Sequence, residues 1–285
     1  MSLSKNKAEF VAFYASRFPN LEIESYLSRK NTPVLLFSPQ HETELRLMFS
    51  REKLSWTPYR VFPHTIERPP EAPTADSLPG FREGWLYSLN PSSLLPVLAL
   101  DPQPEDAILD ASAAPGGKTL AILNFTYPAT PVLVTNDVSA QRCKQLAATL
   151  KHFGYPEIPV LHQPVQTLST TLKARFDKIL LDAPCSGEKH VFNSKRFLKI
   201  WSPRNITKMA TLQQTLLESL LPLLKPRGVL VYSTCALTRE ENEEQITSLL
   251  RKYADLRLES PMRRVNDPNS NYDPMFVATV AKKQA

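Results

Sequence analysis

Two of the three cysteines in this chain follow short apolar runs at matching positions. Cys185 lies in the segment Leu-Asp-Ala-Pro-Cys-Ser-Gly, which begins at the last residue of the run 178–181. Cys235 lies in the segment Tyr-Ser-Thr-Cys, which begins at the last residue of the run 229–232. Such runs predict buried parallel strands, and open α/β sheets place ligands beyond the carboxyl ends of such strands. Two thiols at one edge indicate covalent chemistry, because a thiolate is a strong nucleophile. Taken singly, each is more simply a small buried hydrophobic residue, which is our interpretation of Cys143.

A turn with two adjacent glycines precedes both cysteines and could hold a small anionic ligand. The sequence Asp-Ala-Ser-Ala-Ala-Pro-Gly-Gly-Lys-Thr at 110–119 follows an apolar run and opens a predicted helix. Adjacent glycines let a ligand approach the backbone, and a helix N-terminus offers unpaired N–H groups. A nucleotide P-loop needs a glycine at position 112, where serine stands, and the dinucleotide pattern G-x-G-x-x-G is absent. A tight turn without a ligand is the plainer alternative.

Asp137 ends the next predicted strand, about 20 residues beyond the glycine turn, where an acidic side chain can bind ribose hydroxyls. The same residue could instead be the N-cap of a helix beginning near Ala140. Ser139 could take that capping role and leave Asp137 free. The sequence therefore favours ribose binding by Asp137.

The elements that must position these residues alternate between helix and strand from about residue 86. We expect strands at 107–110, 132–135, 158–161, 178–181 and 229–232, with helices at 92–100, 118–124, 140–153, 205–224 and 239–253. This alternation predicts an α/β fold, a parallel sheet covered on both faces. Two last strands, 256–259 and 275–280, could form an antiparallel hairpin at one edge. The arrangement matches the Rossmann-like seven-stranded methyltransferase sheet.

The first 85 residues have a different pattern. Residues 1–57 predict a small N-terminal α+β region, mostly helical with a strand at Val34–Phe37, which we interpret as an RNA-docking region. Residues 58–85 contain many prolines and predict an extended linker. Residues 86–285 then form the main domain.

The composition is that of a globular enzyme. The chain has 285 residues, 42% of them hydrophobic and 22% charged. It has no apolar run long enough for a membrane span. We expect no secretory signal, because residues 1–7 lack an apolar segment, and the few cysteines favour a reducing compartment. The formal net charge of +6 favours a polyanionic partner, although many basic proteins bind no nucleic acid.

The motifs at 113–119, 181–187 and 232–237, in this order, resemble those of the RsmB/Nop2/Sun family of RNA cytosine-5 methyltransferases. Segments 93–102, 201–203 and 241–243, together with Gln213, are also similar to that family. The resemblance covers about residues 86–280 and is nearest to the smaller bacterial or organellar members. It implies S-adenosylmethionine as cofactor, no metal, and rRNA or tRNA as substrate. The residues it implies for cofactor binding are Ala113, Ala114, Pro115, Gly116, Gly117, Lys118, Thr119, Asp137 and Asp182.

The resemblance also implies separate roles for the two thiols. Carbon 5 of cytosine becomes nucleophilic only after a nucleophile adds to carbon 6. By resemblance Cys235 makes that addition, Cys185 assists product release, and Asp182 lies between cofactor and base. DNA cytosine methyltransferases use the cysteine of a Pro-Cys motif as nucleophile, and the residues alone leave both assignments open. Lys118 could pair with Asp182, bind the cofactor carboxylate or be solvated.

The segment between the two cysteines is basic and contains interleaved aromatic residues. Basic groups follow a phosphate backbone, and aromatic rings can stack on unpaired bases. A solvated loop is the plainer alternative, and we interpret Trp201 as structural. The predicted RNA-binding residues are Lys189, Lys195, Arg196, Lys199, Arg204 and Lys208.

Three positions depart from the family pattern. Pro164 aligns with the aspartate that contacts the cofactor adenine in the family, so Gln163 or backbone groups would have to replace it. The Pro-Gly-Gly turn before the second cysteine strand is Pro-Arg-Gly at 226–228. The segment 35–38 is Leu-Leu-Phe-Ser where an Arg-x-Asn-Thr element is expected.

Three functions agree with these features to different degrees. The first is methyl transfer to carbon 5 of a cytosine in RNA. The second is an RNA-binding ribosome assembly factor with little or no turnover, which Pro164 favours. The third is a DNA cytosine methyltransferase. The sequence favours this function least, because no evident target-recognition domain follows the motifs. We expect a cytoplasmic protein, or an organellar matrix protein whose presequence has been removed, with a ribosomal subunit or accessory protein as partner.

Overall fold

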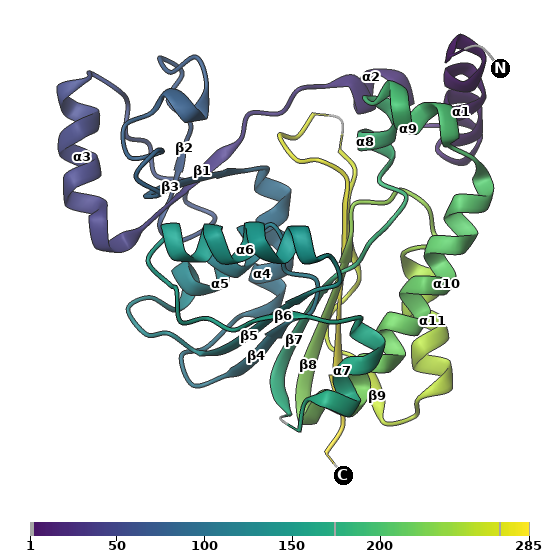
Figure 1. Ribbon diagram of the computed structural model, residues 1–285. Helices are drawn as coiled ribbons and strands as arrows, with labels where there is room; N and C mark the ends of the chain where they lie inside the picture. The colour runs from purple at the N-terminus through teal and green to yellow at the C-terminus, as the bar shows by residue number, and fades with distance from the viewer. Residues whose placement is uncertain (1–2, 174, 268, 285) are drawn as a thin grey trace.

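A computed structural model describes residues 3–173, 175–267 and 269–284, and its centre is an eight-stranded sheet (Figure 1). The strands run in the order β10-β11-β8-β7-β4-β5-β6, and β9 pairs with β11 beside β10. Five adjacent strands are parallel to one another: β4 (Ala107–Asp110), β5 (Val132–Asp137), β6 (Val160–His162), β7 (Phe176–Asp182) and β8 (Leu224–Thr234). The predicted α/β class is confirmed.

The antiparallel edge differs in detail from the predicted hairpin. Strand β11 (Met275–Lys282) runs antiparallel to β8, and β9 (Leu256–Leu258) pairs with it as expected. The polar segment between them contributes a further strand, β10 (Arg263–Val265), which pairs with the other end of β11. Two short strands therefore share one edge position, and seven expected strands become eight.

Helices cover both faces of this sheet because its buried strands are apolar on both sides. Successive residues of a strand point to opposite faces, so Leu180 packs on one side and Leu181 on the other. The first face is covered by α4 (Leu95–Leu100), α5 (Gly117–Thr126) and α6 (Ala140–His152). The second is covered by α7 (Val165–Thr171), α10 (Pro203–Leu220) and α11 (Glu243–Lys252).

Residues 34–89 build a second, three-stranded sheet. Strand β1 (Val34–Phe37), predicted from the sequence, lies between β2 (Thr65–Glu67) and β3 (Leu86–Leu89), and both pairings are antiparallel. Helix α3 (Glu42–Arg51) packs on it through Leu45 and Phe49. The segment predicted as a linker thus contains β2 and is anchored by backbone pairing. Its prolines prevent regular helix but not a three-residue strand.

The first two helices lie apart from this small sheet. In Figure 1, α1 (Leu3–Arg17) and α2 (Ile23–Ser28) lie beside α8 (Glu188–Phe192) and α9 (Lys195–Ile200), on the opposite side of the molecule from α3. Phe10 and Tyr14 are fully buried there, and the Phe10 ring lies 4.9 Å from that of Trp201. Residues 1–57 therefore contribute to two structural units instead of one.

Four short 3-10 turns complete the described elements: η1 (Pro39–His41), η2 (Ala75–Ser77), η3 (Pro91–Leu94) and η4 (Leu221–Leu223). Within residues 3–173, 175–267 and 269–284, no helix combines the length and apolar character needed to cross a membrane.

Candidate active site

The two cysteines meet at the carboxyl edge of the central sheet. Strands β7 and β8 are parallel neighbours with Asp182 opposite Ser233, so the turns that follow them lie side by side. The Sγ atoms of Cys185 and Cys235 are 3.2 Å apart. Gly187 has a positive φ of 57°, and a Cβ there would lie 3.8 Å from the Cys235 sulfur. The pairing of thiols expected from the sequence is present in the structure.

The environments of the thiols differ. Cys235 is exposed, whereas Cys185 is half-buried. The pKa of Cys185 is raised well above its usual range, first by the hydrogen bond with Cys235 and then by burial. Cys143 is buried in α6, and its sulfur lies 3.3 and 3.4 Å from the carbonyl oxygens of Asp137 and Leu161, one of which accepts its S–H, in keeping with a structural role.

Asp182 lies beside the thiols and is held by two neighbours. Its carboxylate accepts a hydrogen bond from the Lys118 ammonium at 2.6 Å and from the Ser233 hydroxyl at 2.8 Å. Burial alone would lower the pKa of Lys118, but the charges of Asp182, Asp110 and Cys235 raise it. Lys118 therefore stays protonated and pairs with Asp182, one of the alternatives left open by the sequence.

The glycine turn connects β4 to α5 as predicted. Gly116 has a φ of +117°, which side-chain-bearing residues rarely adopt, and a Cβ on Gly117 would approach the Tyr87 ring to 3.0 Å. Asp110 accepts a hydrogen bond from the Thr119 hydroxyl at 2.8 Å, which ties the strand end to the helix. Burial raises the pKa of Asp110 to about 7.

A cavity of about 260 Å³ opens between this turn and the opposite wall formed by β3 and the segment that follows it. Its walls are Tyr87, Ser88, Leu89, Asn90, Ser93, Ser112, Ala113, Ala114, Pro115, Gly117, Lys118 and Asp182. Six of the predicted cofactor residues are in this set, and Gly116 and Thr119 shape the turn behind them. The cavity combines backbone of the turn, hydroxyl groups and one ion pair, which suits a polar ligand with a charged end.

Asp137 lies outside that lining and is already hydrogen-bonded. Its carboxylate accepts from the Ser139 amide at 3.0 Å and faces the Arg142 guanidinium at 3.3 Å, and only 2% of its side chain is exposed. Ser139 is the N-cap of α6, as the sequence allowed. Arg142 also donates to the carbonyl of Ala114, so it joins Asp137 to the glycine turn.

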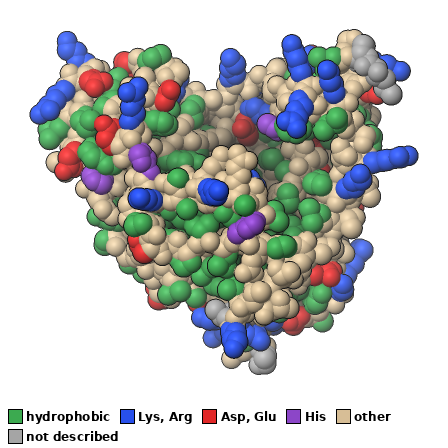
Figure 2. Space-filling model, in the orientation of Figure 1, with side chains coloured by type: hydrophobic (Ala, Val, Ile, Leu, Met, Phe, Trp, Pro, Cys, Tyr) green, Lys and Arg blue, Asp and Glu red, His purple; other side chains and the backbone are tan. Residues whose placement is uncertain are grey.

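The predicted RNA-binding residues lie on α8, α9 and the start of α10. Figure 2 shows Lys and Arg side chains along the rims of both upper lobes, with a hollow between the lobes. Lys189 is paired with Asp273. The exposed members of the set are Lys195, Arg196, Lys199, Arg204 and Lys208. Trp201 packs against Phe10 and Phe13, which confirms its structural interpretation.

The departures from the family pattern have clear structural settings. Pro164 precedes α7, and the Gln163 side-chain oxygen accepts from the Thr171 hydroxyl at 2.7 Å. The backbone N–H of Gln163 donates to Asn136 at 3.2 Å. Arg227 adopts a φ of +64° at the position where the family has glycine. This conformation is strained for a residue with a side chain.

Sequence reasoning missed four polar residues that shape the site. Ser233 donates a hydrogen bond to Asp182, and Arg142 donates one to the glycine turn, as described above. Glu188 and Glu241 are fully buried behind the cysteine turns. Ser233 and Glu241 lie in or next to the quoted motifs, but a motif gives no contacts for its members. The sequence shows Glu188 and Glu241 three and six residues beyond the cysteines, but nothing in it indicates that they are buried.

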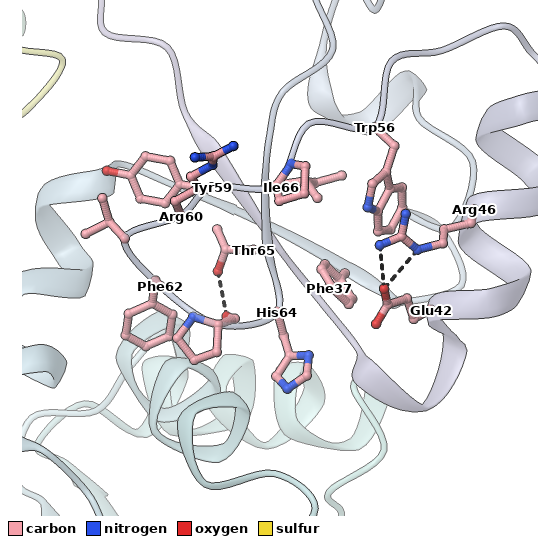
Figure 3. Close-up of a pocket in the computed structure, with 13 residues that line it drawn as sticks. Phe37, Glu42, Arg46, Trp56, Tyr59, Arg60, Phe62, His64, Thr65 and Ile66 are labelled. Atoms are coloured by element: carbon pink, nitrogen blue, oxygen red, sulfur yellow. Dashed lines mark hydrogen bonds and ion pairs between the residues drawn. The ribbon is translucent and has the colours of Figure 1, made fainter.

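A larger cavity of about 490 Å³ lies in the small-sheet unit and contains none of the predicted site residues. Figure 3 shows Arg46 turned toward Glu42, with which it pairs at 2.7 Å, beside Trp56. His64 and Phe37 form another part of its wall. Among the residues that the structure describes, no group of His, Cys, Asp and Glu side chains could hold a metal ion.

A parallel sheet covered on both faces, with its cavity and reactive side chains beyond the strand ends, defines a Rossmann-like fold of the methyltransferase type. The chain belongs to the family described as 16S rRNA methyltransferase RsmB/F, whose model matches residues 97–280. The resemblance seen in the motifs is confirmed.

Curated relatives agree with this family. The chain is 43% identical over 176 residues to ribosomal RNA small subunit methyltransferase F of Aeromonas salmonicida, covering 60% of this chain and 37% of that protein. It is 42% identical over 173 residues to the protein of that name from Klebsiella pneumoniae, with coverage of 60% and 36%. The matched region thus spans well under half the length of these relatives.

Solved structures share the fold over most of the chain. A methyltransferase homolog from Pyrococcus horikoshii has a TM-score of 0.77 and 26% identity, covering 90% of this chain and 88% of that one. NSun6 from the same organism, solved with SFG, has a TM-score of 0.67 and 26% identity, with coverage of 77% and 60%.

Proposed function

We propose that this chain transfers a methyl group from S-adenosylmethionine to carbon 5 of a cytosine in RNA, through a covalent bond to Cys235. The observation that carries the proposal is the 3.2 Å contact between the Cys185 and Cys235 sulfurs beside Asp182. Methyltransferases that modify nitrogen or oxygen have no need of paired thiols, whereas carbon 5 requires prior addition at carbon 6.

The different environments of the thiols support the assignment of roles. Cys235 is exposed, so a cytosine of the RNA can reach its sulfur. Lys118 interacts electrostatically with the same thiol. Cys185 has a raised pKa, so it keeps its proton and can donate its S–H to the Cys235 sulfur. This supports Cys235 as nucleophile and Cys185 as the residue that assists release.

The proposed reaction balances with these groups. The Cys235 thiolate forms a bond to carbon 6, and the electron pair of the carbon 5–carbon 6 double bond becomes available at carbon 5. When bound, S-adenosylmethionine would supply an electrophilic methyl group to that carbon, and its sulfur–methyl bond would break to leave S-adenosylhomocysteine. A base then removes the carbon 5 proton, the double bond re-forms, and the carbon–sulfur bond breaks to release Cys235. Asp182, held by Lys118 and Ser233, would accept a hydrogen bond from the cytosine amino group.

The lining of the cavity beside the glycine turn suits the proposed cofactor. Gly117 lets the turn pack closely against the Tyr87 ring, and Lys118 and Asp182 form the charged end of the cavity. Asp137 remains the proposed ribose ligand. Its carboxylate would exchange its present contact with Arg142 for contacts with the ribose hydroxyls. Family membership agrees with S-adenosylmethionine as the donor, and the NSun6 structure contains SFG.

We further propose that the substrate is ribosomal RNA, since the curated relatives are named as small-subunit enzymes. The exposed Lys and Arg side chains of α9 and α10 would follow its phosphates. The target base must leave its stack to reach the thiols. Because α1 and α2 pack beside α8 and α9, we assign the docking role expected for residues 1–57 to these two helices.

Incubation of the protein with methyl-labelled S-adenosylmethionine and RNA from a deletion strain tests the proposal. We expect label in RNA, and bisulfite sequencing should then locate the modified cytosine. RNA binding without detectable binding of S-adenosylmethionine by calorimetry would instead support the assembly-factor alternative. Transfer of label to a position other than carbon 5 would overturn the chemistry proposed for the thiols.

A further inference from the structure

Two buried carboxyl groups lie behind the cysteine turns and have no part in the reaction described above. Glu188 opens α8, three residues after Cys185, and Glu241 lies six residues after Cys235. Both are 0% exposed. Each binds the opposite turn: the Leu237 amide donates to Glu188 at 3.0 Å, and the Ser186 amide donates to Glu241 at 2.9 Å. The pair therefore connects the two segments that position the thiols.

One hydroxyl group bridges the two carboxyl groups. The Ser186 oxygen lies 2.7 Å from Oε1 of Glu188 and 2.5 Å from Oε1 of Glu241. A serine hydroxyl has one hydrogen, so it can donate to only one of these oxygens. At the other it must accept, and that carboxyl group must therefore carry a proton. Two ionised carboxylates would leave one of the short contacts without a hydrogen.

The remaining contacts indicate which carboxyl group holds the proton. Glu241 receives the Ser186 amide, the Gln213 amide at 2.9 Å and the Thr238 hydroxyl at 3.3 Å, all of which favour its charged form. Glu188 receives the Leu237 amide, its own backbone amide and the Tyr14 hydroxyl, the last at 2.9 Å. Burial and the nearby Glu241 raise the pKa of Glu188 to about 7.

Several titratable groups face this pair from the surrounding elements. Tyr14 approaches from α1 and Cys185 from the turn after β7. Tyr232 approaches from β8 and donates to the main-chain carbonyl of Glu241 at 2.6 Å. Helix α10 contributes the neutral amide of Gln213. Burial raises the pKa of both tyrosines, so at neutral pH they add no charge.

We propose that Glu188 is a positioning residue that shares one proton with Glu241 through Ser186, and that this proton fixes the Cys185 turn against the Cys235 turn. When Glu188 is neutral, its O–H donates to Ser186, and Ser186 donates to Glu241. Loss of the proton places like charges on both sides of the Ser186 oxygen and pushes the turns apart. The importance of the spacing for catalysis rests on the proposed function, but the shared proton does not.

Infrared difference spectroscopy on the full chain detects the proton without any substrate. A protonated carboxyl group has a carbonyl band well separated from that of a carboxylate. We expect this band to be present below pH 7 and to be lost above, and we expect Glu188→Gln to lack the part of it that Glu188 contributes. Asp110 also has a pKa of about 7, so the band is assigned by comparing the wild type with the variant. An unchanged band in Glu188→Gln would overturn the proposal.

Cross-linking of the two thiols measures their spacing. A short reagent that alkylates both sulfurs is used, and the ratio of bridged to singly labelled protein is determined by mass spectrometry. We expect Glu188→Ala to lower this ratio about tenfold, because a buried hydrogen bond from each turn is lost. Glu188→Gln keeps a neutral donor and acceptor, so it should restore the ratio and remove its fall with rising pH.

Two further outcomes keep the test decisive. If Glu188→Ala fails to fold, Ser186→Ala removes only the bridging hydroxyl and should lower the ratio in the same direction. Equal ratios in the wild type and every variant would overturn the positioning role. Both measurements need neither RNA nor cofactor. If both measurements gave the expected results but no methyl transfer were found, the proposed function alone would be contradicted.

Discussion

Cys185 and Cys235 are 50 residues apart in the chain, and their sulfurs lie 3.2 Å apart because β7 and β8 are parallel neighbours in register. The raised pKa of Cys185 and the exposure of Cys235 make the pair unequal. One thiol is accessible, and the other keeps its proton beside it.

This inequality gives the first prediction. Cys235→Ala should abolish methyl transfer, because no sulfur remains to add to carbon 6. Cys185→Ala should instead trap a covalent adduct with RNA, since addition proceeds but release does not. Denaturing gel electrophoresis with labelled RNA detects the adduct. An adduct with Cys235→Ala and none with Cys185→Ala would reverse the two roles.

Asp182 is the basis of the second prediction. Asp182→Asn keeps the shape of the side chain but removes the charge that faces Lys118, and we expect a rate loss of about a hundredfold. Single-turnover kinetics at saturating RNA measures the chemical step. Ser233→Ala, which removes only one of the contacts to Asp182, is the matched control and should lose much less. Equal losses would mean that orientation, and not charge, is the contribution of Asp182.

The third prediction concerns Pro164 and the cofactor. Pro164→Asp would supply the acceptor that the family places at this position, and a new hydrogen bond corresponds to about a tenfold gain in affinity. Calorimetric titration with S-adenosylmethionine measures it. Pro164→Ala separates the effect of losing the proline ring from that of gaining the carboxylate. A gain shared by both variants would show that the carboxylate is not the cause.

Arg227 provides the fourth prediction, on stability. Its φ of +64° costs about 1 kcal/mol or more for a residue with a side chain, so Arg227→Gly should raise the free energy of unfolding by about 1 kcal/mol. Denaturant titration gives this value. Arg227→Ala removes the long side chain but keeps the strained backbone, so it should give no such gain. A similar rise in both variants would locate the effect in the side chain.

Glu188 gives the fifth prediction, on pH dependence. Its pKa is raised in the folded protein from 4.5 to about 7, so the folded state binds this proton more tightly than the unfolded state. The contribution to stability is therefore complete below pH 4.5 and falls as the pH rises toward 7. By linkage, the free energy of unfolding falls by about 3 kcal/mol in full.

Glu188→Gln should remove this dependence. The difference in unfolding free energy between wild type and variant, measured by denaturant titration at several pH values, isolates Glu188 from Asp110. A difference that does not change between pH 4.5 and 7 would contradict the assignment.

The sequence predicted the central sheet well, because its strands are apolar on both faces and stand between clear turns. The strand at Ala107–Asp110 was placed at its observed ends, and the edge location of both cysteines followed from the strands before them. Resemblance then added the roles of the residues. The cavity lining agrees with most of the expected cofactor residues, while their binding roles remain predictions.

The small sheet and the buried carboxyl pair could not be predicted. Strand β2 has three residues, too few for a visible alternation, and it forms only because β1 offers a pairing edge. The aromatic residues of α1 indicated a helix but not its partner. Glu188 and Glu241 look like ordinary acidic residues in the sequence, and only tertiary contacts reveal that both are fully buried.

The hydrogen bond from Tyr14 to Glu188 joins residues 174 positions apart. During synthesis, α1 leaves the ribosome long before α8, α9 and Leu237, which join α2 in burying Phe10 and Tyr14. For much of translation the aromatic face of this helix therefore has only α2 as a native partner. We expect α1 to reach its final position only once the second cysteine turn has been made, so that a helix synthesised early is placed late.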